Sequence, residues 1–282
     1  LMVARAWALS AGDLKIFEQL LDRQLCCWLL NAPAGVGWAT LRACCKLLIG
    51  FGPERSGVWS AGNGPAMRSA ILGLMSSDKV ALNEAVRLST RVTHTDPRAE
   101  AGALLIARAA RLQVYEPSKT PLRFIEEEAQ RTKDAELKTT LQAVHDGLRQ
   151  ELPCIEFANA QGWTKGVSGY VNRTVPAAMY CWAKSPDDFR RCVSEAVRLG
   201  GDTDTVGAIV GAVCGANLGA AAIPADWIDR LVEWPRTVDW LKRMSQTLLQ
   251  CHETGRPEAP PPMHWPATLS RNALLASIVV GI

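Results

Sequence analysis

The sequence lacks the patterns of several common protein classes. No C-x-x-C pair occurs among its nine cysteines, which stand singly or as two adjacent pairs, so neither a zinc ribbon nor a disulfide framework is indicated. No stretch shows the sustained alternation of a half-buried strand. The first nine residues lack the layout of a signal peptide. We expect reduced thiols, buried as small apolar side chains, in a cytoplasmic protein.

Charge of one sign is also scarce. The 31 Lys and Arg residues against 28 Asp and Glu leave a formal charge of +3, too small and too evenly spread for a nucleic-acid-binding surface. Hydrophobic residues make up 48% and charged residues 21%, close to the averages of globular domains, which argues against a disordered or multi-span membrane protein. A length of 282 residues allows one large or two small domains. We expect neither a nucleic acid nor a membrane as partner.

Helical signals dominate what is present. In Ser185-Pro186-Asp187-Asp188, Ser is a candidate N-cap followed by Pro at the first helical position, and Gly200-Gly201 ends the apolar pattern behind it. Asp96-Pro97 and Thr120-Pro121 repeat this helix start. Further amphipathic stretches cover Leu14 to Leu30, Trp38 to Ile49, Ala66 to Met75, Asn83 to Arg91, Arg98 to Leu112, Leu137 to Leu148 and Val238 to Leu249. The pattern predicts an all-α protein with many helices of moderate length.

The C-terminal part differs in composition. Four prolines in residues 256–262 predict an extended linker, because proline cannot donate a helical hydrogen bond. The apolar residues that follow are too few to span a bilayer. We therefore predict an all-α domain over residues 1–255, a proline-rich linker over 256–262 and a short apolar tail over 263–282. We expect the tail to pack on the domain or on sequence outside this chain.

An acidic turn joins two of the predicted helices. Gly200-Gly201-Asp202-Thr203-Asp204-Thr205 places two carboxylates and two hydroxyl groups within four residues, and such hard oxygen ligands suit Mg²⁺, Mn²⁺ or Ca²⁺. The two glycines allow the backbone to turn tightly enough for both carboxylates to face one point. The alternative is that Asp202 or Thr203 only caps the helix. The spacing alone leaves both interpretations open.

A glycine stripe follows this turn. Gly207, Gly211, Gly215 and Gly219 recur every fourth residue, so they share one face of a helix. In lipid such a face would pair helices; in a water-soluble protein it lets a neighbouring helix approach closely. Acidic residues directly before the stripe favour the second interpretation.

Three further positions could face a ligand. Gly62-Asn63-Gly64-Pro65 precedes a helix, where backbone N–H groups can bind an anion such as phosphate, although a tight loop without a ligand has the same sequence. His94 stands just before the Asp96 helix cap, and a lone histidine in a loop is usually structural. Tyr170 would be an ordinary core residue without further context.

Taken in order, these elements resemble the ADP-ribosylglycohydrolase family. The resemblance covers roughly Leu1 to Leu249. The matching segments are Gly62-Asn63-Gly64-Pro65-Ala66-Met67-Arg68, Thr93-His94-Thr95-Asp96-Pro97, Gly169-Tyr170-Val171 with Thr174-Val175-Pro176, the acidic turn with Gly211 and Gly215-Ala216, and Ile223, Pro224 and Trp227.

The resemblance implies a compact, orthogonal multi-helix all-α hydrolase with two Mg²⁺ or Mn²⁺ ions. It would cleave ADP-ribose from arginine or serine of a modified protein, or from a small ADP-ribosyl compound. Its implied metal ligands are Asp202, Asp204 and Thr205. Its implied substrate-binding residues are Gly62, Asn63, Gly64, Met67, His94 and Tyr170.

One motif of the family has no match. The resemblance implies further metal ligands, and the carboxylate that activates water, in a Thr-Asp-Asp motif close to the N-terminus, and this sequence contains no Thr-Asp-Asp. Because Leu1 corresponds to a position a few residues after that motif, we expect the motif to lie ahead of Leu1 and the chain to be inactive as it stands. No catalytic residue is assigned. The alternative function is a non-catalytic ADP-ribose-binding or structural protein on the same fold.

Overall fold

The structure is a computed structural model that describes residues 1–76 and 78–280. The described chain is all-α, as predicted, and its only strand-like pairings are isolated bridges. The fold consists of two compact units. The first comprises Leu1–Trp59, Arg87–Thr95 and Ala225–Ile282, and the second comprises Ser60–Val86 and Asp96–Pro224.

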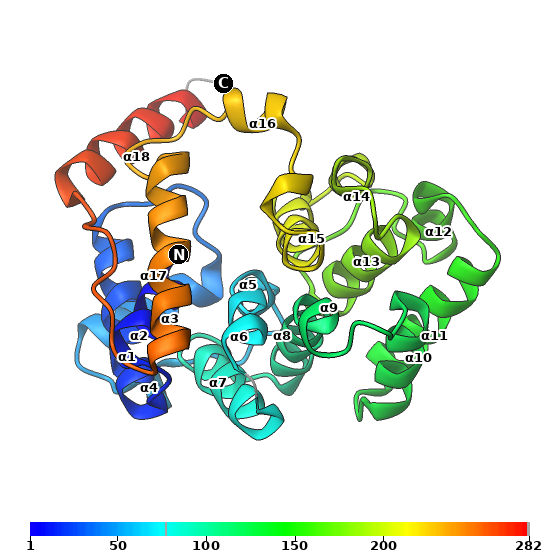
Figure 1. Cartoon of the computed structure of the whole chain (residues 1–282), viewed down its shortest axis with the longest axis horizontal. Coiled ribbons are helices and arrows are strands. Elements are labelled where there is room, and N and C mark those ends of the chain that lie inside the picture. Colours follow the sequence, from blue (N-terminus) through cyan, green and yellow to red (C-terminus); the bar gives the residue numbers. More distant parts are fainter. Residues whose placement is uncertain (77, 281–282) are drawn as a thin grey trace. The chain divides into compact units, whose positions relative to one another are not determined.

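The first unit is built on paired helices (Figure 1). Its elements are α1 (Met2–Ser10), α2 (Leu14–Leu30), α3 (Trp38–Leu48), α4 (Pro53–Ser56), the end of α7 (Lys79–Arg91), α16 (Ala225–Asp229), α17 (Val238–Thr254) and α18 (Trp265–Val280). Helix α1 packs on α2 and on α17, and Trp7 meets Phe17 edge to face at 5.5 Å between ring centroids. The apolar face of α2 buries Phe17, Leu21 and Leu25 here.

The proline-rich segment lies against this unit. The amide of Glu258 donates to the carbonyl of Ala8 at 2.8 Å, and the indole nitrogen of Trp240 donates to the carbonyl of Pro262 at 3.0 Å. The residues beyond it form α18, whose Asn272 donates to the carbonyl of Asn31 at 2.7 Å. The linker and tail boundaries proposed from composition stay a prediction.

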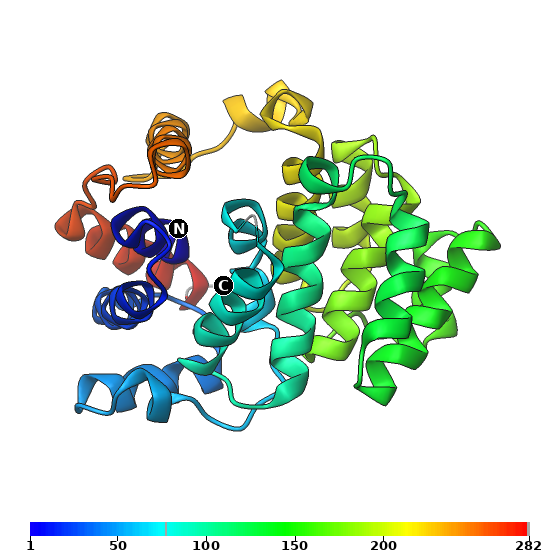
Figure 2. The same ribbon diagram turned by 60° about the horizontal axis from the view of Figure 1, so that its bottom comes forward.

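The second unit holds the remaining helices. They are α5 (Gly64–Met67), α6 (Ala70–Met75), the start of α7, α8 (Pro97–Ala110), α9 (Leu112–Tyr115), α10 (Pro121–Arg131), α11 (Ala135–Arg149), α12 (Cys154–Ala160), α13 (Val171–Lys184), α14 (Phe189–Arg198), α15 (Thr203–Leu218) and a 3₁₀ turn (Ala220–Ala222). Helix α13 is buried along most of its length because α8, α11, α14 and α15 pack around it. Helices α10 and α11 lie side by side next to it (Figure 2).

Most helix boundaries agree with the sequence, with two corrections. The helix after residue 184 begins at Phe189, and its cap is Asp188, which accepts a hydrogen bond from the amide of Arg191 at 2.9 Å; Ser185 lies in the preceding turn. The predicted helix from Ala66 to Met75 is two short helices, α5 and α6. The caps at Asp96 and Thr120 are confirmed, since each side chain accepts an amide hydrogen of the following turn.

Gly207, Gly211 and Gly215 of the stripe face α14, whereas Gly219 follows the end of α15 with φ of +82° and does not share that helix face. A methyl group built on Gly211 would lie 3.7 Å from Val193 and 3.8 Å from Phe189, and one on Gly215 would lie 3.6 Å from Phe189. These are ordinary contact distances, so the stripe packs against side chains of a neighbouring helix within the unit. Within the described part of the chain, no helix combines the length and hydropathy needed to cross a membrane.

Candidate functional site

The acidic turn is shaped by its two glycines. Gly200 and Gly201 have φ of +73° and +77°, a region that residues with a side chain rarely adopt. A Cβ on Gly201 would lie 2.2 Å from the carbonyl oxygen of Val167. That oxygen accepts the amide hydrogen of Asp202 at 2.7 Å, and the amide of Val167 donates to the carbonyl oxygen of Gly200 at 3.1 Å. The close pairing of the two segments sets where Asp202 enters α15.

Asp202 occupies the N-cap position of α15, but its side chain makes no capping hydrogen bond. Its Oδ2 atom instead accepts a hydrogen bond from the side-chain amide of Asn63 at 2.7 Å. Asp202 is half-buried, Asp204 in the first turn is exposed, and Thr205 is buried. The carboxylate of Asp202 is therefore directed at Gly62-Asn63-Gly64, called the glycine loop from here on. The interpretation of Asp202 as only a helix cap does not account for this contact.

Asn63 connects the glycine loop to this turn. The residue is 9% exposed, and its two side-chain amide hydrogens reach Asp202 Oδ2 and, at 3.0 Å, the hydroxyl oxygen of Thr174. The Thr174 hydroxyl in turn donates to the carbonyl of Ser168 at 2.8 Å. This chain of hydrogen bonds fixes the direction of the amide, so the carbonyl oxygen and the N–H groups of Asn63 cannot exchange places without loss.

The backbone of the loop is held by the segment before α13. The amide of Asn63 donates to the carbonyl of Gly169 at 3.0 Å, and Gly62 forms an antiparallel bridge with Tyr170. The amide of Gly62 lies 3.3 Å from the hydroxyl of Ser60. The expectation of anion-binding N–H groups is therefore weakened at Gly62 and Asn63, because both amides have acceptors within the protein. The helix that follows, α5, is a single turn starting at Gly64.

Met67, in that same turn, lies beside α15. Its sulfur is 3.8 Å from the hydroxyl of Thr205, and the residue is 47% exposed. The structure therefore brings together the predicted loop residues and the predicted metal ligands, although they are about 140 positions apart in the chain.

Tyr170 lies in a polar cluster that the sequence did not reveal. Its hydroxyl accepts a hydrogen bond from Arg98 at 3.1 Å and donates to Glu136, and the Arg98 guanidinium lies 5.6 Å from the ring centroid. The Asn172 amide donates to Asp134 at 2.9 Å and to Glu136 at 3.2 Å. Burial first, and then Glu136, raise the pKa of Tyr170, so the phenol stays protonated at neutral pH.

Arg98 is held by the cap of its own helix. Its guanidinium lies 2.6 Å from one carboxylate oxygen of Asp96 and 3.0 Å from the other, and these contacts raise its pKa. Asp96 is 1% exposed and also caps α8 through the amide of Arg98 at 3.0 Å. The position of Arg98, two residues after the helix cap Asp96, could have indicated this contact from the sequence, because a long side chain there can fold back onto the carboxylate of the cap.

His94 belongs to the first unit, whereas the eight other predicted site residues belong to the second. It is 3% exposed, and its Nδ1 atom lies 2.8 Å from the hydroxyl of Thr93. Its backbone pairs with Val58. The structure thus describes a buried histidine held by its own unit, and its role toward a ligand stays a prediction.

The donor set can be compared with the needs of a hard divalent cation. Asp202, Asp204 and Thr205 offer carboxylate and hydroxyl oxygens, which are the ligands Mg²⁺ and Mn²⁺ prefer. No group of three or more His, Cys, Asp or Glu side chains that could hold a metal ion occurs among residues 1–76 and 78–280. The chemistry of the three side chains fits such an ion, and water or substrate oxygens would have to complete its roughly six ligands.

Comparison with known proteins places these features in a family. The model of the ADP-ribosylglycohydrolase family matches residues 1–258. The chain is 28% identical to the ADP-ribosylhydrolase ARH3 of Bos taurus over 207 residues, covering 63% of this chain and 56% of that protein. It is 30% identical to an uncharacterized protein of Archaeoglobus fulgidus over 253 residues, covering 85% and 74%. The chain thus spans little more than half the length of the bovine relative.

Two further matches agree. The ADP-ribosyl-[dinitrogen reductase] glycohydrolase of Rhodospirillum rubrum is 26% identical over 208 residues, covering 72% of this chain and 62% of that protein. A solved structure described as an ADP-ribosylglycohydrolase-related protein complex superposes with a TM-score of 0.57 at 26% identity, covering 90% of this chain and 80% of that one. On the family match and these relatives, the chain belongs to the ADP-ribosylglycohydrolase family.

Proposed function

We propose that the chain acts in the hydrolysis of an ADP-ribosyl bond, removing ADP-ribose from arginine or serine of a modified protein or from a related small compound. Family membership and the names of the bovine and Rhodospirillum relatives support the class of reaction. The observation that carries the proposal is the hydrogen bond between Asn63 and Asp202, because it joins the glycine loop to the acidic start of α15. One site then presents both the substrate loop and hard oxygen ligands.

In this proposal Asp202, Asp204 and Thr205 hold Mg²⁺ or Mn²⁺. When bound, such an ion would polarise a water molecule and bind ribose hydroxyl groups. Gly62, Asn63, Gly64 and Met67 contact the ADP-ribose, and Tyr170 faces it. The Asn63 carbonyl oxygen, fixed by the two hydrogen bonds of its amide group, accepts a hydrogen bond from a substrate hydroxyl.

Tyr170 has a positioning part in this scheme. Arg98 and Glu136 hold its hydroxyl from two sides. A phenol, with an ordinary pKa of about 10, is neutral at pH 7, and the raised pKa of Tyr170 extends this to higher pH. A neutral, oriented ring can stack on or hydrogen-bond a ligand without adding a negative charge next to a diphosphate. We assign no general base to this chain.

Two measurements test the proposal. Calorimetric titration of the chain with ADP-ribose, with and without Mg²⁺, measures binding, and release of ADP-ribose from serine- and arginine-modified peptides measures turnover. We expect metal-strengthened binding by the chain, and turnover when a relative's Thr-Asp-Asp segment precedes Leu1. Binding without turnover in that extended chain would favour the non-catalytic function. Absence of both binding and turnover would refute the proposal. Asp202→Ala should abolish the strengthening of ADP-ribose binding by Mg²⁺ and the turnover of the extended chain.

A further inference from the structure

A second polar site lies in the second unit, at the far end of α8 from Arg98. A cavity of about 230 Å³ opens between the start of α7, the end of α8, α10 and the segment around residue 116. The charged side chains described in its lining are two carboxylates, Glu116 and Glu128, and five cations, Lys79, Arg108, Arg111, Lys119 and Arg131. This described lining therefore carries three more positive than negative charges.

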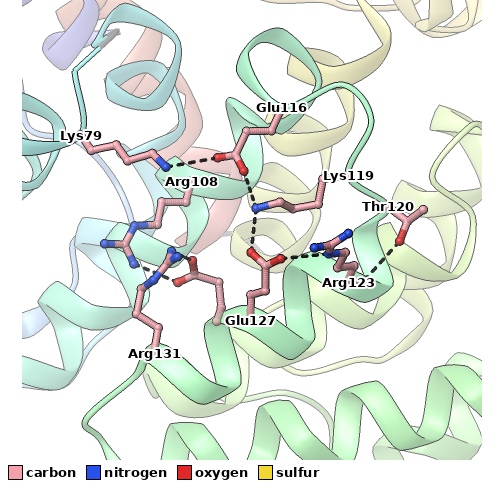
Figure 3. A network of polar contacts seen from close by, with 9 residues as sticks. Lys79, Arg108, Glu116, Lys119, Thr120, Arg123, Glu127 and Arg131 are labelled. Carbon is pink, nitrogen blue, oxygen red and sulfur yellow. Dashed lines mark hydrogen bonds and ion pairs between the residues drawn. The ribbon is translucent and has the colours of Figure 1, made fainter.

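The charged groups form two sets of ion pairs around the cavity, together called the charge network (Figure 3). Glu128, whose side chain is 7% exposed, lies 2.9 Å from Arg108 and also pairs with Arg131. Lys119 pairs with Glu116 and lies 2.7 Å from Glu127, and Lys79 lies 3.8 Å from Glu116. Each of the two cavity carboxylates is thus shared between two cations, so the network keeps an excess of positive charge.

Arg111 adds a cation inside the wall. The residue is 5% exposed, and its guanidinium lies 4.2 Å from the ring centroid of Tyr115, whose hydroxyl donates to the carbonyl of Leu74 at 3.2 Å. Stacking on an aromatic face orients a guanidinium without neutralising its charge. A buried, oriented cation beside a cavity raises the local positive potential, because low-dielectric walls concentrate the field.

The pairing of Glu116 with Lys119 favours the ionised form of both side chains. The hydrogen bond from Lys119 lowers the pKa of Glu116. Burial alone would lower the pKa of Lys119, but hydrogen bonds to Glu116 and Glu127 raise it overall. The fold therefore stabilises the charges of this pair in the cavity wall.

This site is separate from the one built around Asp202. Arg98, which contacts Tyr170, and Arg108, which lines the cavity, are ten residues apart on α8, or about 15 Å at 1.5 Å per residue. Among the described residues that line the cavity, none belongs to the proposed ADP-ribose site.

We propose that this cavity binds a compact, multiply charged phosphate-type anion. Arginine and lysine are the side chains that recognise phosphate oxygens, and two of the cations, Arg108 on α8 and Arg131 on α10, converge on Glu128. The volume is below the ~300–1,000 Å³ of clefts that hold drug-sized ligands, so phosphate or diphosphate fits better than a whole nucleotide. Lys79 and Arg131, whose side chains are 77% and 50% exposed, can turn toward the anion as it enters.

The test is calorimetric titration of the full chain with inorganic phosphate and with pyrophosphate, in metal-free buffer of low ionic strength. We expect one binding event, weakened at least tenfold in the double variant Lys79→Ala and Arg131→Ala. Both side chains lie at the rim, so the variant should fold, and circular dichroism checks that it does. Arg123→Ala is the matched control. The Arg123 side chain is 72% exposed and pairs with Glu127 in the same network, but it is not among the described lining residues.

A second variant, expected to strengthen anion binding, tests the proposal in the opposite direction. Glu116→Gln removes a carboxylate that competes with the anion for Lys79 and Lys119, so it should tighten binding severalfold. Glu151→Gln changes the net charge equally at an exposed position outside the cavity and should leave binding unchanged. Absence of binding, wild-type affinity in the double variant, or an equal loss in Arg123→Ala would overturn the proposal.

Discussion

Asn63 donates a hydrogen bond of 2.7 Å to Asp202, joining residues 139 positions apart at the point where the glycine loop meets the start of α15. The same amide group donates to Thr174 at 3.0 Å, so one side chain holds three segments together. An amide is suited to this place because it donates twice and carries no charge beside a carboxylate.

Asn63→Ala should destabilise the protein. It removes two hydrogen bonds, one of them to a carboxylate, and leaves a void beside the half-buried Asp202, so we expect a loss of about 1–3 kcal/mol in the free energy of unfolding. Urea denaturation at pH 7 measures the loss. Asn83→Ala is the control, since the hydrogen bond that its side-chain oxygen accepts from Arg108, at 3.3 Å, is exposed. Equal effects of the two substitutions would show that Asn63 does not hold the site together.

Asp202→Asn should weaken binding of divalent metal. The substitution keeps the shape of the side chain but removes the charge that a hard cation needs. We expect titration calorimetry with Mn²⁺ to give at least a tenfold weaker affinity than in the wild-type chain. Asp146→Asn, at a carboxylate that is 67% exposed on α11, should leave the affinity unchanged. Failure of the wild-type chain to bind Mn²⁺, or unchanged affinity in Asp202→Asn, would contradict the assignment of Asp202 as a ligand.

Local sequence signals suffice for much of the fold and for part of the site. Helix α2 has the bounds that its apolar spacing predicts, and the Asp13 cap fixes its start. The pattern around residue 185 favours Ser185 as a cap, whereas the structure has Asp188, three residues later, as the cap that accepts the Arg191 amide. The contacts of Asn63 with Asp202, and of Tyr170 with Arg98 and Glu136, join segments far apart in the chain. The spacing of residues in the sequence cannot predict such long-range contacts, because they depend on how the helices pack.

Two glycines in helices should respond in opposite directions to alanine. Gly211→Ala places a methyl group 3.7 Å or more from its neighbours, so the higher helix propensity of alanine should stabilise the protein by about 0.5–1 kcal/mol. Gly73→Ala would place a methyl group 1.9 Å from the carbonyl oxygen of Ala107, which forces α6 away from α8. We expect a loss of more than about 2 kcal/mol there. Thermal unfolding of both variants measures the difference. Stabilisation by Gly73→Ala would contradict the close approach of α6 and α8, and destabilisation by Gly211→Ala would contradict the ordinary contact distances at that glycine.

Tyr180 should make stability fall at alkaline pH. Its side chain is fully buried, its hydroxyl lies 2.7 Å from the carbonyl of Leu152, and its ring stacks on Phe157 at 3.9 Å. Burial first, and then the thiols of Cys154 and Cys181, raise the pKa of Tyr180 far above its ordinary value of about 10. Above pH 10 the unfolded chain therefore loses a proton that the folded chain keeps. The folded state then loses up to about 1.4 kcal/mol of stability per pH unit from this group.

Tyr180→Phe isolates that contribution, because all other titrating groups are shared with the wild-type chain. At pH 7 the variant should be less stable by about 0.5–1.5 kcal/mol, since a buried hydrogen bond to the Leu152 carbonyl is lost. Between pH 10 and 11 the wild-type chain should lose stability faster than the variant, so the difference in unfolding free energy should shrink toward zero. Urea denaturation at pH 7, 9, 10 and 11 follows it. A difference that stays constant across this range would mean that the Tyr180 phenol ionises equally easily in the folded and unfolded chain.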